Sequence, residues 1–292
     1  MRLISASRRT DIPALYAEWF LGRIRAGEAL YRNPYGGAEY RVSLKPEDVR
    51  AIIFWTKNPR PLLPYLGELD GRGYRYYFHF TLTGLPRGLE THVPAPRAAL
   101  DTFRRLSERL GPERVIWRFD PIVLSNRTPA GERLERFGEL ARALAGYTRQ
   151  CITSFVALYG KVRRNFAPLE ARGRRFEDPP EEEKRSLVRS LAGLALPLGI
   201  RLGACCSDYL VGEGVERARC VDGEFVSRLF PDRAAPSRAR PTREQCGCSE
   251  SRDIGAYDTC PQGCAYCYAT ASRPLALARY RLAGRSGSPF LA

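Results

Sequence analysis

The feature that most constrains the fold is a regular alternation of short apolar stretches with amphipathic stretches through residues 2–206 of this 292-residue chain. Apolar side chains spaced three and four residues apart predict helices, whereas short runs rich in β-branched and aromatic residues predict strands. Strands that alternate with helices form parallel βαβ units with right-handed crossovers. The predicted strands span residues 2–7, 51–56, 74–84, 114–124, 150–159 and 200–206, and the predicted helices span residues 14–27, 97–111, 131–147 and 181–199.

This alternation predicts an α/β fold, and a partial or full β/α (TIM-like) barrel is the architecture that suits it best. The strands are apolar on both faces, as in a sheet that helices cover. A flat, doubly wound sheet is the alternative, although no glycine-rich dinucleotide fingerprint supports it. We expect residues 1–206 to form the barrel core. We expect residues 207–292 to form a cysteine-rich segment that closes the barrel mouth and that needs metal as a staple.

Polar and charged residues directly follow or end several of the predicted strands. In a β/α barrel the carboxyl ends of the strands carry the active site, so these side chains are candidates for cofactor binding. A simpler interpretation is helix capping and ion pairing at the rim, for example between Arg118 and Asp120. The candidates are Arg8, Arg9 and Asp11 after the first strand, Lys57 and Asn58 after the second, and Arg118 and Asp120 in the fourth.

The cysteines are unevenly distributed, because eight of the nine lie between Cys205 and Cys267. The amino terminus has no apolar stretch typical of a signal peptide, so we expect a cytoplasmic protein, whose thiols stay reduced. Clustered thiols in that setting indicate metal ligation. Cys260, Cys264 and Cys267 follow the pattern C-x3-C-x2-C. Structural zinc takes four ligands, whereas three thiolates suit a cubane iron–sulfur cluster with one iron open to a small molecule.

The stretch "CPQGCAYC", residues 260–267, resembles the cluster-binding motif of the radical S-adenosylmethionine (SAM) superfamily, in which an aromatic residue precedes the third cysteine. The resemblance implies that Cys260, Cys264 and Cys267 hold a 4Fe–4S cluster and that Tyr266 lies at the cofactor site. It implies that SAM chelates the fourth iron and is cleaved reductively to a 5′-deoxyadenosyl radical. It also implies a β/α barrel and an electron donor such as flavodoxin or ferredoxin.

Segments along nearly the whole chain resemble a single family, the domain of unknown function 1848, which is radical SAM-like. These segments are "ISASRRTDIPALYAEWF", "FWTKNP", "FTLTG", "GPERVIWRFDPI" and "CGCSESRDIGAYDTCPQGCAYCYA". In the superfamily the cysteine motif normally follows the first barrel strand, whereas here it comes last. We therefore expect either a circularly permuted order of elements or a tail that folds back over the barrel mouth.

Four further cysteines, Cys205, Cys220, Cys246 and Cys248, match positions of the same family and form a second candidate metal set. Four thiolates suit an auxiliary 4Fe–4S cluster, which could relay electrons or anchor a substrate, and they also suit a structural zinc ion. Cys206 is the rival ligand to its neighbour Cys205. The remaining cysteine lies within the fifth predicted strand, where we expect it to be buried.

The chain carries a formal net charge of +15, and 43 of its 47 basic residues are arginine, because lysine occurs only four times. Basic side chains bind phosphate backbones, so nucleic acid is a candidate partner. The densest basic stretch is residues 161–176, and "FWTKNP" is similar to the "TK" strand of the spore photoproduct lyase branch, which repairs DNA. An arginine bias spread along the whole chain is the competing explanation.

A radical SAM enzyme that takes SAM as its small-molecule partner is thus the leading hypothesis. The first alternative is a zinc-stapled nucleic-acid-binding protein without SAM chemistry. The second is a SAM-dependent enzyme that transfers a methyl or aminocarboxypropyl group. Since no run of eighteen apolar residues occurs, we expect no membrane-spanning segment. The pattern indicates neither the substrate, nor a catalytic acid or base, nor the oligomeric state.

Overall fold

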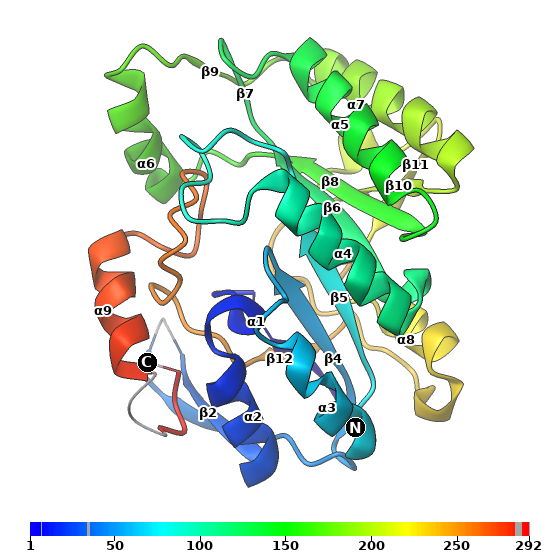
Figure 1. Ribbon diagram of the computed structural model, residues 1–292, viewed down its shortest axis with the longest axis vertical. Helices are drawn as coiled ribbons and strands as arrows, with labels where there is room; N and C mark the ends of the chain where they lie inside the picture. Colours follow the sequence, from blue (N-terminus) through cyan, green and yellow to red (C-terminus); the bar gives the residue numbers. More distant parts are fainter. Residues whose placement is uncertain (7, 34–35, 284–287, 292) are drawn as a thin grey trace.

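One eight-stranded sheet forms the centre of the molecule (Figure 1). The computed structural model describes residues 1–6, 8–33, 36–283 and 288–291. The strands lie in the order β11-β10-β8-β6-β5-β4-β1-β12, and every neighbouring pair is parallel. They are β1 (Arg2–Ala6), β4 (Val49–Thr56), β5 (Tyr76–Thr81), β6 (Val115–Ile122), β8 (Gln150–Phe155), β10 (Arg201–Cys205), β11 (Val215–Ala218) and β12 (Ser251–Asp253). Two antiparallel pairs lie outside this sheet, β2 (Glu28–Arg32) with β3 (Glu39–Ser43) and β7 (Leu124–Ser125) with β9 (Phe176–Glu177).

Amphipathic helices connect most of the strands. The second of them ends at Gly27, whose φ of 72° is a conformation that favours glycine. The seventh begins with three glutamates, which the positive end of the helix dipole stabilises. The helices are α1 (Ile12–Leu15), α2 (Ala17–Ala26), α3 (Leu66–Gly71), α4 (Pro96–Leu110), α5 (Ala130–Leu144), α6 (Gly160–Glu170), α7 (Glu181–Ala195), α8 (Gly223–Leu229) and α9 (Arg273–Ala283). Within the described ranges, every helix is too short or too polar to cross a lipid bilayer.

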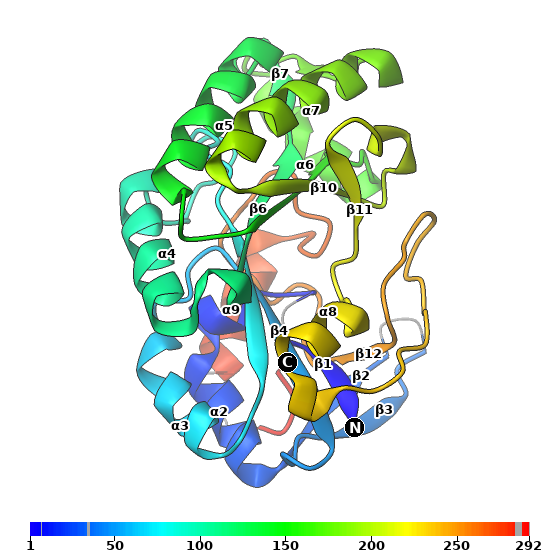
Figure 2. The ribbon, with the colours of Figure 1, turned by 90° about the vertical axis from the view of Figure 1, so that its right-hand side faces the viewer.

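Alternate side chains of the strands face opposite sides of the sheet, and the two sides differ in what covers them. On one side, large aromatic residues such as Phe54, Phe78 and Trp117 pack against the connecting helices and form the main core. On the other side, smaller residues such as Ala51 and Ile116 pack against the chain from residue 205 to residue 248. Figure 2 shows α8 and the adjoining yellow and orange chain on the side of the sheet opposite α3, α4 and α5.

The mixed α/β fold predicted from the sequence is confirmed, since all six predicted strands and all four predicted helices are present with shifted ends. The finer prediction, a sheet that closes into a barrel, stays a prediction: in the described residues no ladder joins β11 to β12. Both of these strands come from residues 207–292 and were missed. They read "VERA" and "SRD", so backbone pairing at the sheet edges, and not an apolar pattern, makes them strands.

Candidate functional site

The motif cysteines lie in the loop between β12 and α9, which runs past the loop that follows β5 (Figure 1). Cys264 forms an isolated antiparallel bridge with Glu90. The backbone N–H of Ala265 donates to the Leu89 carbonyl at 2.9 Å. Within the motif, the N–H of Cys267 donates to the Cys264 carbonyl at 3.1 Å. Backbone hydrogen bonds therefore hold the motif in a turn against the loop after β5.

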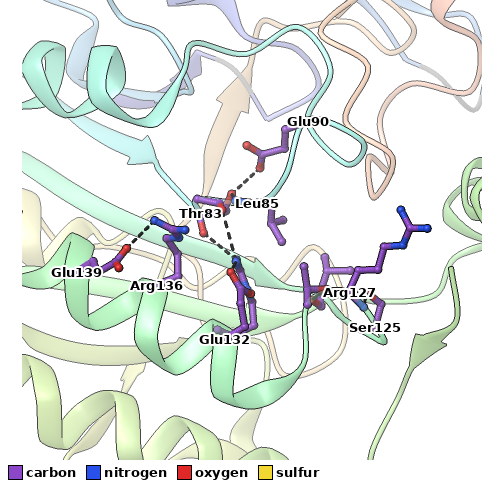
Figure 3. Close-up of polar contacts among 12 residues, drawn as sticks. Thr83, Leu85, Glu90, Ser125, Arg127, Glu132, Arg136 and Glu139 are labelled. Atoms are coloured by element: carbon purple, nitrogen blue, oxygen red, sulfur yellow. Dashed lines mark hydrogen bonds and ion pairs between the residues drawn. The ribbon is translucent and has the colours of Figure 1, made fainter.

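Glu90 is the polar centre of this region, because donors from three different segments converge on its Oε1. Lys57 Nζ lies 2.8 Å away and Thr83 Oγ1 2.6 Å away, and the hydroxyl of Tyr266 donates to the same oxygen. Figure 3 shows the Glu90 carboxylate turned toward Thr83. Burial alone would raise the pKa of Glu90, but Lys57 and the other donors hold it below its ordinary value. The charged carboxylate therefore fixes Tyr266, the residue before the third motif cysteine.

Lys57 and Asp11 connect the motif to the ends of β4 and β1. Asp11 Oδ2 accepts the backbone N–H of Lys57 at 2.8 Å and Nε2 of Gln262 at 3.0 Å, while its Oδ1 caps α1 through Ala14 at 3.1 Å. Burial raises the pKa of Asp11. Burial opposes the charge of Lys57, but the attraction of Glu90 outweighs it and the pKa of Lys57 is raised. We call Asp11, Lys57, Glu90 and Gln262 the polar wall of the motif.

The other candidates near these strand ends separate from one another. The Arg8 guanidinium lies 5.8 Å from the ring centroid of Trp55, and its Nη2 has no hydrogen-bond partner in the described residues. The Arg9 guanidinium instead lies 5.4 Å from the ring centroid of Tyr257, in a cleft of about 630 Å³. Asn58 Oδ1 accepts the backbone N–H two residues further along the chain at 3.3 Å. Asn58 therefore stabilises its own turn, as capping residues do.

The second set of cysteines gathers on the sheet face opposite the main core. Cys205 Sγ lies 2.8 Å from Cys220 Sγ and 3.8 Å from Cys206 Sγ. Cys248 interacts both with Cys220 and with Cys246. All are free thiols, and 2.8 Å is well beyond the length of a disulfide bond, about 2.05 Å. Five thiols from three segments thus meet near the end of β10, with Cys206 among them.

Arg118 and Asp120 adjoin this second set and not the motif. Arg118 Nη1 lies 3.2 Å from Cys220 Sγ, and its Nη2 lies 2.5 Å from Asp120 Oδ2. Asp120 also accepts the hydroxyl of Ser154. Burial disfavours the charge of Arg118, but Cys220 and Asp120 raise its pKa well above the ordinary value. His79 Nε2 lies 2.8 Å from the Cys220 carbonyl, and burial lowers the pKa of His79 to about 3, so its ring is neutral.

The two cysteine groups differ in their electrostatic surroundings. Burial raises the pKa of Cys260 and raises that of Cys264 to about 12, while each motif thiol interacts with the other two. In the second set, contact with Cys205 holds the pKa of Cys220 well below its ordinary value, and Arg118 also favours the thiolate. Lys57 favours the thiolate of Cys264, but burial outweighs it, so the motif thiols need an added cation to ionise together. In the second set, Cys205 and Arg118 already favour the thiolate of Cys220.

Both donor sets suit a thiophilic metal. In the described part of the chain, no three His, Cys, Asp or Glu side chains have the geometry of a metal site. The donor chemistry nevertheless fits iron or zinc, because thiolates are the soft ligands that both take. All of these cysteines are free thiols, and the motif thiols are half-buried and near enough for Cys264 and Cys267 to raise the pKa of Cys260. Such thiols are stabilised as thiolates by a bound cation.

Sequence analysis missed Glu90, Thr83, Gln262 and His79 as residues of these two regions. Gln262 could have been found, because it lies inside the motif. Glu90 gave no local signal, since its partners Lys57 and Tyr266 are 33 and 176 residues away along the chain. His79 likewise gave no local signal, because its link to Cys220 depends on a contact over 141 residues.

Comparison with known proteins gives one match. The sequence model of a family described as "Domain of unknown function (DUF1848)" matches residues 3–269, a range that includes both cysteine groups and the whole polar wall. No curated protein and no solved structure matches the chain.

Proposed function

The chain belongs to the DUF1848 family, and we propose that it is a radical SAM-like enzyme built on a sheet that curves into a partial barrel. Cys260, Cys264 and Cys267 would hold a 4Fe–4S cluster at the mouth of that barrel. When bound, the cluster and SAM supply the reductive cleavage of SAM to a 5′-deoxyadenosyl radical. The proposal leaves the substrate of that radical open.

The observation that carries the proposal is a group of three thiols held in a defined loop, one ligand fewer than a structural zinc site takes. Three free thiols interact with one another in the loop after β12, and burial raises the pKa of two of them. A structural zinc site takes four protein ligands, whereas a cluster that binds a small molecule leaves one metal position open. The polar wall adjoins these thiols and is tied together by hydrogen bonds from Lys57 to Glu90 and from Gln262 to Asp11.

Within this site the chain's own residues position and hold charge. Glu90 accepts hydrogen bonds from the hydroxyl of Tyr266 and the ammonium of Lys57, so both groups are positioned before a ligand binds. Lys57 keeps a positive charge beside Cys264, which favours thiolate and an anionic ligand group. Asp11 holds Gln262, a residue of the motif itself, against the end of β4. The wall thus keeps the motif in one geometry.

The second set, Cys205, Cys220, Cys246 and Cys248, would hold an auxiliary 4Fe–4S cluster or a zinc ion. Arg118 lies 3.2 Å from Cys220 Sγ and favours its ionised form. Such a site would fasten the chain after β10 to the second face of the sheet. Metal analysis distinguishes the two sites, because an iron–sulfur cluster contains both iron and sulfide, whereas a zinc site contains zinc without sulfide.

The test is anaerobic purification followed by iron, sulfide and zinc analysis, and then incubation with SAM and a reductant. We expect about eight irons per chain, or about four irons and one zinc, and reductant-dependent 5′-deoxyadenosine. Zinc alone, with no cleavage of SAM, would contradict the proposal and support a zinc-stapled binding protein. Methylthioadenosine or S-adenosylhomocysteine as the product would instead indicate aminocarboxypropyl or methyl transfer.

A further inference from the structure

A basic surface next to the motif has no role in the proposed chemistry. We call it the α6 wing: residues 159–176, which comprise Tyr159, helix α6 and the chain leading to β9. The wing contains six basic residues and a single acidic one, Glu170. Its basic residues are Lys161, Arg163, Arg164, Arg172, Arg174 and Arg175. In the described residues, none of the six forms an ion pair.

Helix α7 differs from the wing in this respect. All three basic residues of α7 are paired with carboxylates. Lys184 pairs with Asp178, Arg185 with Glu181 and Glu182, and Arg189 with Glu213. The same chain therefore neutralises its cations on α7 and leaves them without carboxylates on the neighbouring wing. A surface of this kind attracts an external polyanion.

Arg174 gives an independent indication of an anion. Its side chain is largely buried, with 8% of the residue exposed, and its Nη1 has no hydrogen-bond partner in the described residues. Burial and the nearby charge of Arg127 both disfavour its ionised form. A largely buried guanidinium with an unsatisfied nitrogen and a second positive charge nearby is stabilised by an anion such as a phosphate.

Exposed aromatic rings lie where the wing meets the motif. Tyr159 and Tyr268 are 45% and 48% exposed, and their ring centroids are 6.5 Å apart with the planes inclined at 62°. Tyr268 directly follows the third motif cysteine, and its hydroxyl donates to the Arg8 carbonyl at 2.7 Å, which fixes the ring. Exposed aromatic rings beside arginines are the stacking platforms that unpaired bases use.

The wing also packs directly against the motif. Val162 and Phe166 of α6 belong to a small apolar cluster with Leu89, and Ala265 and Tyr266 of the motif pack on that cluster. Figure 1 shows the orange segment that carries the motif passing close to α6. A polymer bound to the wing would therefore lie next to the motif.

We propose that the α6 wing binds the phosphate backbone of a single-stranded nucleic acid and presents one of its nucleotides to the cysteine motif. This inference deepens the proposed function and rests on it, since it names the substrate class of the same site. A duplex is excluded as the direct ligand because paired bases cannot stack on the two tyrosines. A base must also leave its stack to reach a half-buried site.

The experiment measures the affinity of the full chain for fluorescently labelled oligonucleotides of about twenty nucleotides by fluorescence anisotropy. The probes are a single-stranded DNA of thymidines and a single-stranded RNA of uridines, each titrated over a range of KCl concentrations. Arg163→Gln/Arg164→Gln should weaken binding about tenfold near physiological salt and reduce the slope of log K against log salt by about 1.4, because each phosphate contact on a single strand contributes about 0.7. The matched control, Arg185→Gln/Arg189→Gln, removes the same charge from α7 and should leave both values nearly unchanged. Arg174→Met should weaken binding without lowering the midpoint of urea unfolding, since Arg174 Nη1 has no hydrogen-bond partner in the described ranges of the chain.

The strand preference separates DNA from RNA, and polyglutamate of similar length is the probe for a merely anionic ligand. Equal losses in the α6 and α7 variants, or displacement of the strand by polyglutamate at equal charge, would overturn the proposal. So would tighter binding to a duplex than to the single strand. Strand binding that persists in a protein without SAM cleavage would contradict the proposed function and the presentation of a nucleotide to the motif, and would leave only the binding of the strand by the α6 wing. SAM cleavage without strand binding would support the proposed function and overturn this inference.

Discussion

The two cysteine groups reach their positions in opposite ways. The motif supplies its three thiols from residues 260–267, a stretch of eight consecutive residues on one loop. The second group draws on residues 205–206, 220 and 246–248, which meet only after β10 and β11 have paired in the sheet. A local group needs only a clamp to hold its shape. A distributed group exists only in the folded chain, so metal binding there is coupled to folding.

Each group also has its own buried polar anchor, of opposite charge. Glu90 anchors the motif loop through Lys57 and Tyr266. Arg50, a residue of β4 that is 3% exposed, anchors the chain around the second group. Its guanidinium donates to the Gly223 and Arg233 carbonyls at 2.7 and 2.9 Å and also to two serine hydroxyls. The comparison predicts that the two regions fail separately when their anchors or thiols are changed.

The largest expected effect comes from removing one thiol of each group. Cys264→Ser should abolish SAM cleavage and reduce the metal content by the share of one cluster, about four irons per chain. Cys248→Ser should remove the second metal site and lower the stability of the fold, because its ligands come from distant segments. It should leave cleavage of SAM by a chemical reductant in place. The measurements are iron and zinc content, 5′-deoxyadenosine formation and the urea midpoint.

The variants Cys264→Ser and Cys248→Ser together test whether the two cysteine groups act independently. Cys151→Ser serves as the control, because Cys151 is buried in β8 within the main core and belongs to neither group. Its metal content should match that of the wild type. If Cys248→Ser also abolished SAM cleavage with the motif cluster still bound, the two groups would act as one site and the comparison would fail.

The same contrast explains how much of the fold and of the candidate sites could be predicted from the sequence. Periodicity predicted the parallel sheet and its helices, and contiguity made the motif visible. The tail was harder, because β12 pairs with β1 through "SRD", a stretch whose strand identity lies in its backbone partner. The ligand candidates at strand ends were also resolved only by the fold. Lys57 and Asp11 join the motif wall, whereas Arg118 and Asp120 lie on the second face beside Cys220. Alternation along β6 sets the face of Arg118, whereas Lys57 and Asp11 follow the ends of β4 and β1 and are placed by long-range hydrogen bonds.

The next effect concerns the anchor of the motif. Glu90→Gln keeps the shape of the side chain but leaves the ammonium of Lys57, whose side chain is 12% exposed, without its charge partner. Loss of one partner of a buried pair costs about 3 kcal/mol of unfolding free energy, measured by urea denaturation. Glu68→Gln is the control, since Glu68 pairs with Arg25 and Arg72 at the surface and should matter far less.

The pH dependence of this difference has a definite sign. The folded-state pKa of Glu90 is held below its ordinary value of 4.5. Its stabilising contribution is therefore fully present above pH 4.5 and is lost only as the pH falls through the lowered pKa. The gap between wild type and Glu90→Gln should be constant near neutrality and should shrink on acidification below that ordinary value. A gap that grew on acidification would show that the carboxylate is not the form that stabilises the loop.

The smallest effect concerns the anchor of the second group. Arg50→Met removes the donors to the Gly223 and Arg233 carbonyls but also removes a buried charge, and burial lowers the pKa of Arg50. These contributions oppose each other, so we expect a net loss of about 2 kcal/mol. Hydrogen exchange should then accelerate at residues 223–237 and remain slow at residues 258–270. Arg75→Met, which breaks a surface pair with Asp232 in the same segment, is the control and should change exchange little. Faster exchange in both segments would mean that Arg50 supports the sheet as a whole, and the two regions would then share one anchor.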